Sequence, residues 1–560
     1  MVRKMTPDHR KYQNKPAPQN RPDDGESLSA AAPVSARRAA LSVAILGATG
    51  FWLGFPNPLL QVPALVLLYP LALLELARTA ASWRRAFRNG LGCGILGCSA
   101  CLYWISVPIH DFGHLPWLVA VPTAISLGCY LALYSAVFTA AMHWSWRNLS
   151  PLWLGIMALS AWALLEYLKG WVLSGFAWLT LSAAFVPWYP VVQGAALIGA
   201  YALSGLFVAM VAWLAGAWRQ KSKACLAAAL LTAASLTVFG GINLAGTAPT
   251  PDKAFRVLLV QGNINQDQKW NPANVLATIN SYTRLTASGL ERLPGADVAG
   301  SSQTSALMPP LVIWPETAMP FMYSMDYAYG LKLRNLAREA GINLLFGVPG
   351  MEAEPNLAPE EYPLFNRAHL IDATGKDAGI YEKEHLVPFG EYPPSWINLP
   401  FLDFFLAQVG DFTPGVRTQP LSLNGIALGV LICYETIFPE LSQRRAEQGA
   451  TVLVNISNDA WFGLTSAPEQ HLQLTAMRAV EQGRYLLRGT NTGISSLVDP
   501  WGRILFRSRL FSAEAIPVVA YARDGHTPFF FVANYMPWLL TALLALACSS
   551  QFLRRRGQPA

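Results

Sequence analysis

The chain has 560 residues, of which 53% are hydrophobic and only 13% are charged, and its mean hydropathy is +0.30. Soluble domains carry roughly 25% charged residues, so this composition excludes an ordinary soluble enzyme as well as a disordered or fibrous protein. Residues 250–525 hold 21 basic and 27 acidic residues, whereas the rest holds 20 basic and 7 acidic ones. The net charge of +7 therefore lies in tails and short loops, which indicates membrane topology and no nucleic-acid partner.

Eight apolar stretches predict membrane-spanning helices, because each approaches the roughly 20 residues that cross a bilayer. They cover residues 39–55, 58–75, 89–108, 115–143, 152–168, 191–217, 225–243 and 533–553. The first seven predict a transmembrane domain at 39–245. A polar segment at 1–38, rich in Pro and Ala, is expected to be a disordered cytoplasmic tail, and 554–560 a second tail.

Basic residues alternate between the loops and thereby predict orientation. Eight Lys or Arg precede the first span, four lie between the second and third, one follows the fourth, and three follow each of the sixth and eighth. The opposite loops hold only Lys169. Because basic loops stay in the cytoplasm, both termini are expected there, with residues 250–525 on the outer side.

Three features of the apolar half leave choices open. A GxGxxG match at 92–97 lies inside a span with no strand before it, so helix packing by small residues explains it better than phosphate binding. Glu166 is an intramembrane carboxylate, either a functional group or one that pairs with Lys169. The aromatic stretch from Phe176 to Pro190 is either an interfacial belt or a vestibule that faces lipid.

Beyond residue 250, short β-rich runs alternate with helical patterns, which predicts one layered α/β domain at 250–525. The expected strands are 255–262, 311–315, 343–348, 366–371, 426–432, 450–457, 494–499, 503–507 and 515–521. The expected helices are 271–293, 329–340, 439–448 and 468–488. Flexible insertions are expected at 295–309 and 351–364.

Cys433 is the one cysteine of the seven that lies in this outer domain. A solitary thiol in an oxidising compartment has no disulfide partner, so it is either an inert core residue or a nucleophile. It ends the apolar run that begins at Gly429 and precedes a helical pattern. A strand-to-helix turn of this kind leaves the next backbone N–H free to meet an oxyanion.

Two further strand ends supply polar groups that a cysteine nucleophile needs. Glu316 follows the apolar run at 311–314, and Lys383 shares a loop with Glu391. A thiol needs a base, and acyl transfer needs a cation or N–H at the developing oxyanion. Each residue alone is more typical of a surface ion pair, but together they indicate covalent catalysis.

Four motifs in order resemble the nitrilase, or carbon–nitrogen hydrolase, superfamily: WPE at 314–316, EKEHLVPFGEY at 382–392, ICYE at 432–435 and NISNDAWFG at 455–463. More narrowly, nearly the whole chain, spans included, resembles the bacterial apolipoprotein N-acyltransferases. The resemblance implies an α-β-β-α sandwich inserted into a multi-pass α-helical membrane protein. It also implies a Glu-Lys-Cys triad at Glu316, Lys383 and Cys433. Four further residues are marked as important: Trp270, Glu391, Tyr434 and Glu435.

The family reaction implies the partners. A fatty acyl chain passes from a membrane phospholipid, through a cysteine thioester, to the N-terminal amine of a diacylated apolipoprotein. The expected place is the bacterial inner membrane, with the catalytic domain in the periplasm, and the expected state is a monomer. The outer histidines lack ligand spacing, so neither a metal nor a cofactor is expected.

An apolar loop follows the lysine motif. Residues 396–409 include Phe401, Phe404 and Phe405 and are strongly apolar for a loop of the outer domain. Either they pack in the core or they form an arm that meets lipid.

Two other functions compete with acyl transfer. A membrane-tethered amidase would use the same triad, but the spans and the apolar loop would then be unexplained. A transporter or sensor would place charged residues along the spans, and apart from Glu166 these spans hardly have any.

The loop charges yield the first testable prediction. Reporters fused after residue 30, after residue 222 and at the C-terminus should be active in the cytoplasm, because basic loops flank these points. A reporter inserted near residue 300 should be active only outside. A cytoplasmic signal at residue 300 would contradict the placement of the outer domain.

Overall fold

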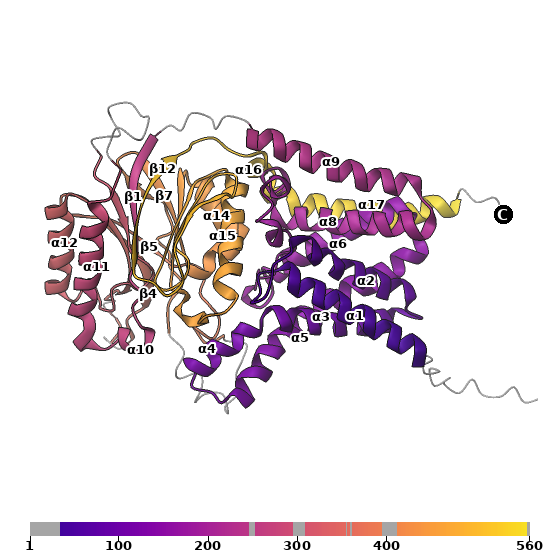
Figure 1. Ribbon diagram of the computed structural model, residues 1–560, viewed down its shortest axis with the longest axis horizontal. Helices are drawn as coiled ribbons and strands as arrows, with labels where there is room; N and C mark the ends of the chain where they lie inside the picture. The colour runs from indigo at the N-terminus through magenta and orange to yellow at the C-terminus, as the bar shows by residue number, and fades with distance from the viewer. Residues whose placement is uncertain are drawn as a thin grey trace, which may run out of the picture.

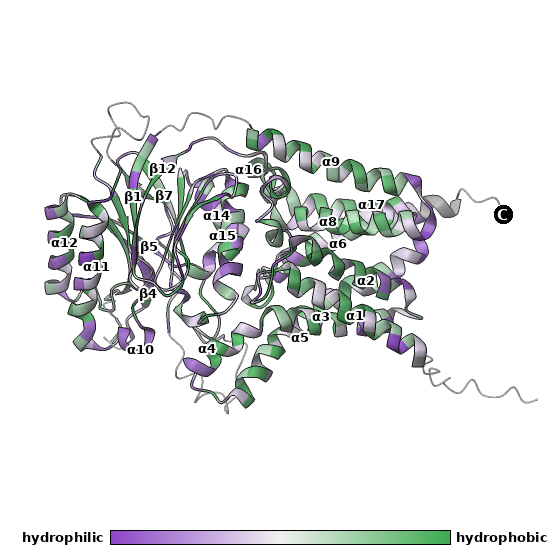
Figure 2. Ribbon diagram, in the orientation of Figure 1, coloured by the Kyte–Doolittle hydropathy of each residue, from purple (hydrophilic) through white to green (hydrophobic). Residues whose placement is uncertain are grey.

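The computed structural model describes residues 34–245, 253–294, 308–353, 356–358, 361–394 and 411–556. Figure 1 shows a helical half on one side and a half built from two sheets on the other. The predicted tail before residue 34, most of the insertion at 295–309, and the loop with Phe401, Phe404 and Phe405 lie outside the described residues. The two halves differ in hydropathy, because long apolar helices dominate only the helical half (Figure 2).

The helical half contains nine principal helices in the described ranges. They are α1 (Val34–Gly54), α2 (Leu68–Thr79), α3 (Trp83–Cys101), α4 (Ser106–Asp111), α5 (Trp117–Asn148), α6 (Pro151–Lys169), α8 (Ala195–Gln220), α9 (Lys223–Ala245) and α17 (Met536–Arg556). By length and composition, five helices of the described chain could cross a membrane, or six if α3 and the segment ending in α4, bent by 60°, form one span. The predicted count of eight spans is therefore not confirmed.

The second predicted span shows why the count differs. Its apolar stretch, 58–75, is divided between a short 3-10 helix (η1, Pro63–Leu67) and α2, which has only 12 residues. Twelve helical residues rise about 18 Å, short of the roughly 30 Å hydrocarbon core. The first span also differs, because α1 begins at Val34 and includes Arg37 and Arg38 in its opening turns.

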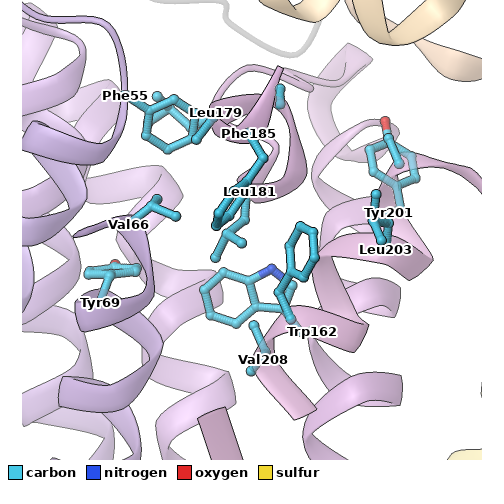
Figure 3. Packing of buried hydrophobic residues seen from close by; sticks show 14 of the residues in the cluster. Phe55, Val66, Tyr69, Trp162, Leu179, Leu181, Phe185, Tyr201, Leu203 and Val208 are labelled. Carbon is cyan, nitrogen blue, oxygen red and sulfur yellow. The ribbon is translucent and has the colours of Figure 1, made fainter. Parts of the chain in front are cut away.

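Small residues bring the membrane helices together. A Cβ at Gly94 would lie 2.8 Å from the Cα of Ala132 on α5, and one at Gly90 would lie 2.4 Å from Thr139 Oγ1. The GxGxxG match thus lies in a helix that packs closely against another helix, and no strand precedes it within the described residues 34–91. Large apolar residues fill the neighbouring space in one buried cluster, which includes Trp162 of α6, Leu181 and Val208 (Figure 3).

The outer half contains two six-stranded sheets. The first has the order β12-β1-β2-β3-β4-β5, with β1 (Lys253–Gln261), β2 (Leu311–Ile313), β3 (Asn343–Met351), β4 (Leu364–Ile371), β5 (Asp377–Glu382) and β12 (Glu514–Ala522). The second has the order β11-β10-β9-β8-β7-β6, with β6 (Leu421–Leu423), β7 (Ile426–Ile432), β8 (Val452–Ser457), β9 (Leu486–Thr490), β10 (Ser496–Val498) and β11 (Ile504–Arg507). β1, β2 and β3 run parallel, as do β7, β8 and β9.

The strands β5, β6 and β9 were not predicted. The predicted helix at 468–488 ends six residues early, because Gly483 adopts φ +62° and terminates α15 (Ala467–Gln482). The chain then returns into the sheet as β9. The other nine strands and the other three predicted helices of this half lie within a few residues of their predicted ranges, but the short helix α10 (Gln266–Lys269) was not predicted.

Four layers form this half, which confirms the predicted α-β-β-α sandwich. Apolar side chains from both sheets, such as Val257, Leu345, Val430 and Val454, share one buried core. α11 (Val275–Leu290) and α12 (Tyr327–Ala340) cover the first sheet, while α14 (Pro439–Glu447) and α15 lie on the second (Figure 1). The α15 layer also faces the membrane helices, and its core is continuous with theirs.

Polar bonds fasten α15 to the helical half. The side chain of Gln470 accepts hydrogen bonds from the indole N–H groups of Trp104 (3.1 Å) and Trp178 (2.9 Å). Its amide donates to the backbone carbonyls of Pro56 and Cys101. One buried amide thus joins three segments of the helical half to the outer domain.

The end of α6 organises the connection from the other side. Glu166 accepts from Trp162 Nε1 and from the backbone N–H of Leu181, both at 3.0 Å. Lys169 donates to the carbonyl of Leu179 at 3.3 Å. Both charged residues therefore hold the segment that follows α6, which packs against the outer domain.

Replacement of Gln470 tests this docking. Gln470→Leu should lower the free energy of unfolding by at least about 2 kcal/mol, because two indole N–H groups and two carbonyls lose their partner. Thermal unfolding of the purified protein in detergent measures the change. The exposed Gln220→Leu serves as control. Equal stability of the two variants would show that Gln470 does not fasten the halves.

Candidate active site

Three candidate residues lie at the ends of strands. Glu316 follows β2 by three residues, Lys383 directly follows β5, and Cys433 directly follows β7. β2 and β5 belong to the first sheet and β7 to the second, so the group forms where the two sheets face each other. The charges of Glu316 and Lys383 both act on the Cys433 thiol.

Cys433 occupies a strained, buried turn. Its φ is +51°, which L residues seldom adopt, and it opens the 3-10 turn η10 (Cys433–Ile437). Burial raises the pKa of the thiol, the Glu316 carboxylate raises it further, and Lys383 opposes both effects. The thiol is therefore protonated at neutral pH, and a base must remove its proton as it attacks.

The Glu316 carboxylate is fixed by three groups. Oε1 accepts from the amide of Asn366 at 2.8 Å and lies 3.5 Å from Lys383 Nζ. Oε2 accepts from the backbone N–H of Asn458 at 2.9 Å. An oriented carboxylate beside a protonated thiol has the form of a general base.

Lys383 is a buried cation between two carboxylates. Its side chain is 1% exposed, and Nζ lies 2.8 Å from Glu391 Oε2. Burial alone would lower the pKa of Lys383, but Glu391 and Glu316 outweigh it and raise the pKa. The amide of Asn366 also donates to Glu391 at 2.9 Å, so one amide bridges both carboxylates. Lys383 therefore stays an ammonium that can face a developing oxyanion.

Glu435 joins the cysteine turn to the lysine loop. Its carboxylate accepts from the backbone N–H groups of Ile432 (2.6 Å), Glu384 (2.8 Å) and His385 (3.1 Å), and from the Tyr381 hydroxyl (2.9 Å). Burial raises the pKa of Glu435 to about 7, although these donors oppose the rise. Four donors on one carboxylate hold the strand ends of β5 and β7 together.

The remaining candidates lie at the edges of the cluster. The Tyr434 hydroxyl donates to the carbonyl of Gly175 at 2.9 Å, so the residue after Cys433 contacts the helical half directly. Trp270 follows the short helix α10 (Gln266–Lys269), and its side chain is 49% exposed.

Several residues of the site were not predicted from the sequence. Asn366 lies inside β4, and only the pairing of β4 with β3 and β5 brings it to the two carboxylates. Asn458 belongs to a recognised motif but contributes its backbone, which residue type does not reveal. Beneath the cysteine, His471 contacts the carbonyl of Cys433 at 3.2 Å and pairs with Asp459.

No group of three or more His, Cys, Asp and Glu residues within the described ranges could hold a metal ion. The cluster contains a thiol, a carboxylate and an ammonium, which are group types that acyl transfer through a covalent intermediate can use.

Known protein families match both halves of the chain. The carbon-nitrogen hydrolase family matches residues 256–522, and the N-terminal domain of apolipoprotein N-acyltransferases matches residues 47–214. The apolipoprotein N-acyltransferase of Geobacter metallireducens is 33% identical over 521 residues, which cover 92% of this chain and 95% of that protein. The one from Nitrosomonas europaea is 35% identical over 502 residues, which cover 86% and 93%.

Two solved structures are similar to the outer half. Saccharomyces cerevisiae Nit3, a member of the nitrilase superfamily, aligns with 52% of this chain and 97% of its own, with 19% identity and a TM-score of 0.36. An amidase from Nesterenkonia sp. aligns with 51% of this chain and 96% of its own, with 22% identity and a TM-score of 0.34.

A substitution at Glu435 tests its bridging contacts. Glu435→Gln should slow alkylation of Cys433 by iodoacetamide about tenfold or more, because the amide has one acceptor oxygen and turns an N–H₂ group toward backbone donors. Mass spectrometry of the Cys433 peptide measures the rate, and the exposed Glu339→Gln is the control. Equal rates in the two variants would show that Glu435 does not shape the turn.

Proposed function

Because the chain belongs to the apolipoprotein N-acyltransferase family, we propose that it moves a fatty acyl chain from a membrane phospholipid to the N-terminal amine of a diacylglyceryl-cysteine apolipoprotein. One observation carries the proposal for the site. Cys433 lies within the electrostatic reach of Glu316 and Lys383, in a domain whose core is continuous with apolar membrane helices. The three residues act as nucleophile, base and oxyanion cation.

The first half of the reaction forms a thioester. Glu316 takes the proton of the Cys433 thiol as sulfur attacks the ester carbonyl of the phospholipid. The tetrahedral oxyanion faces the Lys383 ammonium and the backbone N–H of Tyr434. Collapse breaks the ester bond, and Glu316 returns its proton to the departing lysophospholipid oxygen.

The second half transfers the acyl group. The neutral amine of the diacylated cysteine attacks the thioester, and Lys383 again faces the oxyanion. Glu316 accepts a proton from the amine as the carbon–sulfur bond breaks, and the proton then returns to the Cys433 sulfur. The product is an amide, and no metal or cofactor takes part in any step. Glu391 keeps Lys383 charged and in place throughout.

Lipid substrates account for the membrane half. Both donor and acceptor are anchored in the bilayer, so the thiol must lie close to its surface. We propose an inner-membrane monomer with both termini in the cytoplasm and residues 250–525 in the periplasm. Trp270 is exposed and available to substrate, and the apolar segment at 396–409, with Phe401, Phe404 and Phe405, is proposed to meet acyl chains.

Hydrolysis of a small amide is the alternative function. The same three residues would serve it, with water in place of the amine. The extensive contacts between α15 and the membrane helices would then have no chemical purpose, which favours acyl transfer.

A two-substrate assay tests the proposal. With labelled phospholipid and a diacylglyceryl-cysteine peptide, wild-type protein should form labelled N-acyl peptide. Cys433→Ala should abolish the product, and Glu316→Gln and Lys383→Met should each lower the rate by about 10²-fold or more, because they remove the base and the oxyanion cation. Cys129→Ala, in α5, is the control and should react at the wild-type rate.

Two results would contradict the proposal. Undiminished transfer by Cys433→Ala would remove the nucleophile from the mechanism. Rapid release of free fatty acid in place of labelled peptide would favour the hydrolase.

A further inference from the structure

Lys269 is a second buried lysine beside the candidate base. Its side chain is 1% exposed, which is rare for lysine. Nζ donates to the hydroxyl of Thr317 at 2.6 Å and to the backbone carbonyl of Glu316 at 3.5 Å. Within the described residues no carboxylate lies in ion-pair contact with it. Burying an ammonium with so few partners is costly, so its retention requires a reason.

The residue that Lys269 binds is strained. Thr317 has φ +44°, a conformation that is unfavourable for a β-branched residue. The turn also lies against β3, where a Cβ at Gly347 would come within 2.4 Å of the Thr317 nitrogen and 2.6 Å of the Glu316 Cα. The hydrogen bond from Lys269 is therefore one of the contacts that holds the base in this turn.

The segment that carries Lys269 reaches the base by a second route. Gln266, at the start of α10, accepts from the amide of Asn458 at 2.8 Å. The backbone N–H of Asn458 donates to the Glu316 carboxylate. The exposed Trp270 follows Lys269 directly. One short segment thus contacts the backbone of the base, reaches its carboxylate through Asn458, and presents a tryptophan to solvent.

We propose that Lys269 is a positioning residue for Glu316: its ammonium pins the strained turn after β2 and biases the charge of the base, and its helix ties the base to Trp270. This inference rests on the proposed function, because it assigns Glu316 the role of base. Lys269 is not among the residues to which the family resemblance assigns a role.

The positive charge of Lys269 favours the ionised form of a neighbouring carboxylate. Burial lowers the pKa of Lys269 to about 7, and Glu316 opposes this change. Below that pH Lys269 is an ammonium, which disfavours protonation of the nearby carboxylate. Glu316 lies between the cations Lys269 and Lys383. It shares Lys383 and Asn366 with the Glu391 carboxylate and interacts electrostatically with the Cys433 thiol, while Asp267 lies on the helix of Lys269. Loss of Lys269 should therefore matter most below about pH 7, where the wild-type protein holds this cation beside the Glu316 carboxylate.

The test compares Lys269→Met with wild type in the two-substrate assay. Lys269→Met should lower kcat about tenfold, with KM changed less than about twofold, because the base is misplaced while substrate contacts remain. The acid limb of its pH–rate profile should move to higher pH. Lys269→Arg, which restores a cation, should return the limb toward wild type. Lys332→Met, at an exposed position on α12, is the control.

An unchanged rate and acid limb in Lys269→Met, equal to those of Lys332→Met, would overturn the inference. If Lys269→Met does not accumulate, Thr317→Val decides, because it keeps the cation and removes the acceptor hydroxyl. A fall in kcat with an unmoved acid limb then supports positioning, and a wild-type kcat contradicts it. Glu316→Gln distinguishes failure of the Lys269 inference from failure of the proposed function. Wild-type activity in that variant contradicts the proposed function itself, whatever the result for Lys269.

Discussion

The buried ammonium group of Lys383 lies between the carboxylates of Glu316 and Glu391. Removing one partner from such a buried cluster typically costs about 3–5 kcal/mol, because a charge is left uncompensated. The cluster therefore constrains where the ends of β2 and β5 can lie, and Asn366 of β4 closes it by bonding both carboxylates. Glu435 extends the constraint across the second sheet, since it accepts from the lysine loop and from the last residue of β7. The strained turn at Cys433 is thus held from several directions before any substrate arrives.

The same turn is connected to the helical half. Tyr434 bonds the carbonyl of Gly175, and the Tyr392 hydroxyl of the lysine loop lies 2.6 Å from Ser174 Oγ. Gln470 on α15 adds bonds to the segments around Pro56, Cys101 and the two buried tryptophans. The strand ends, the Cys433 turn and the apolar helices therefore form one packed unit. A rigid attachment of this kind places a thiol at a fixed height relative to the apolar helices, which suits substrates that move within a lipid layer.

The sequence was informative where a property belongs to one segment. Cys433 could be singled out because it ends the apolar run of β7 and has no cysteine partner in the outer domain. A layered α/β domain followed from alternating strands and helices, whereas the four-layer sandwich came from the family resemblance. Properties that arise between segments were not predicted. Asn366 and Lys269 reach Glu316 only through the strand pairing and the turn after β2. The division of 58–75 between η1 and α2, both of which pack against α1, does not show in the apolar pattern. β9 was missed because the helical pattern of α15 continues past Gly483, where a positive φ ends the helix.

The central claim is that the acyl group rests on Cys433 between two substrates. Intact-mass analysis of protein incubated with phospholipid alone tests it most directly. The account predicts one added acyl mass, located on the Cys433 peptide, removed by neutral hydroxylamine and discharged on addition of a diacylglyceryl-cysteine peptide. An acyl mass on another residue, or efficient transfer with no acylated protein in single-turnover samples, would contradict it.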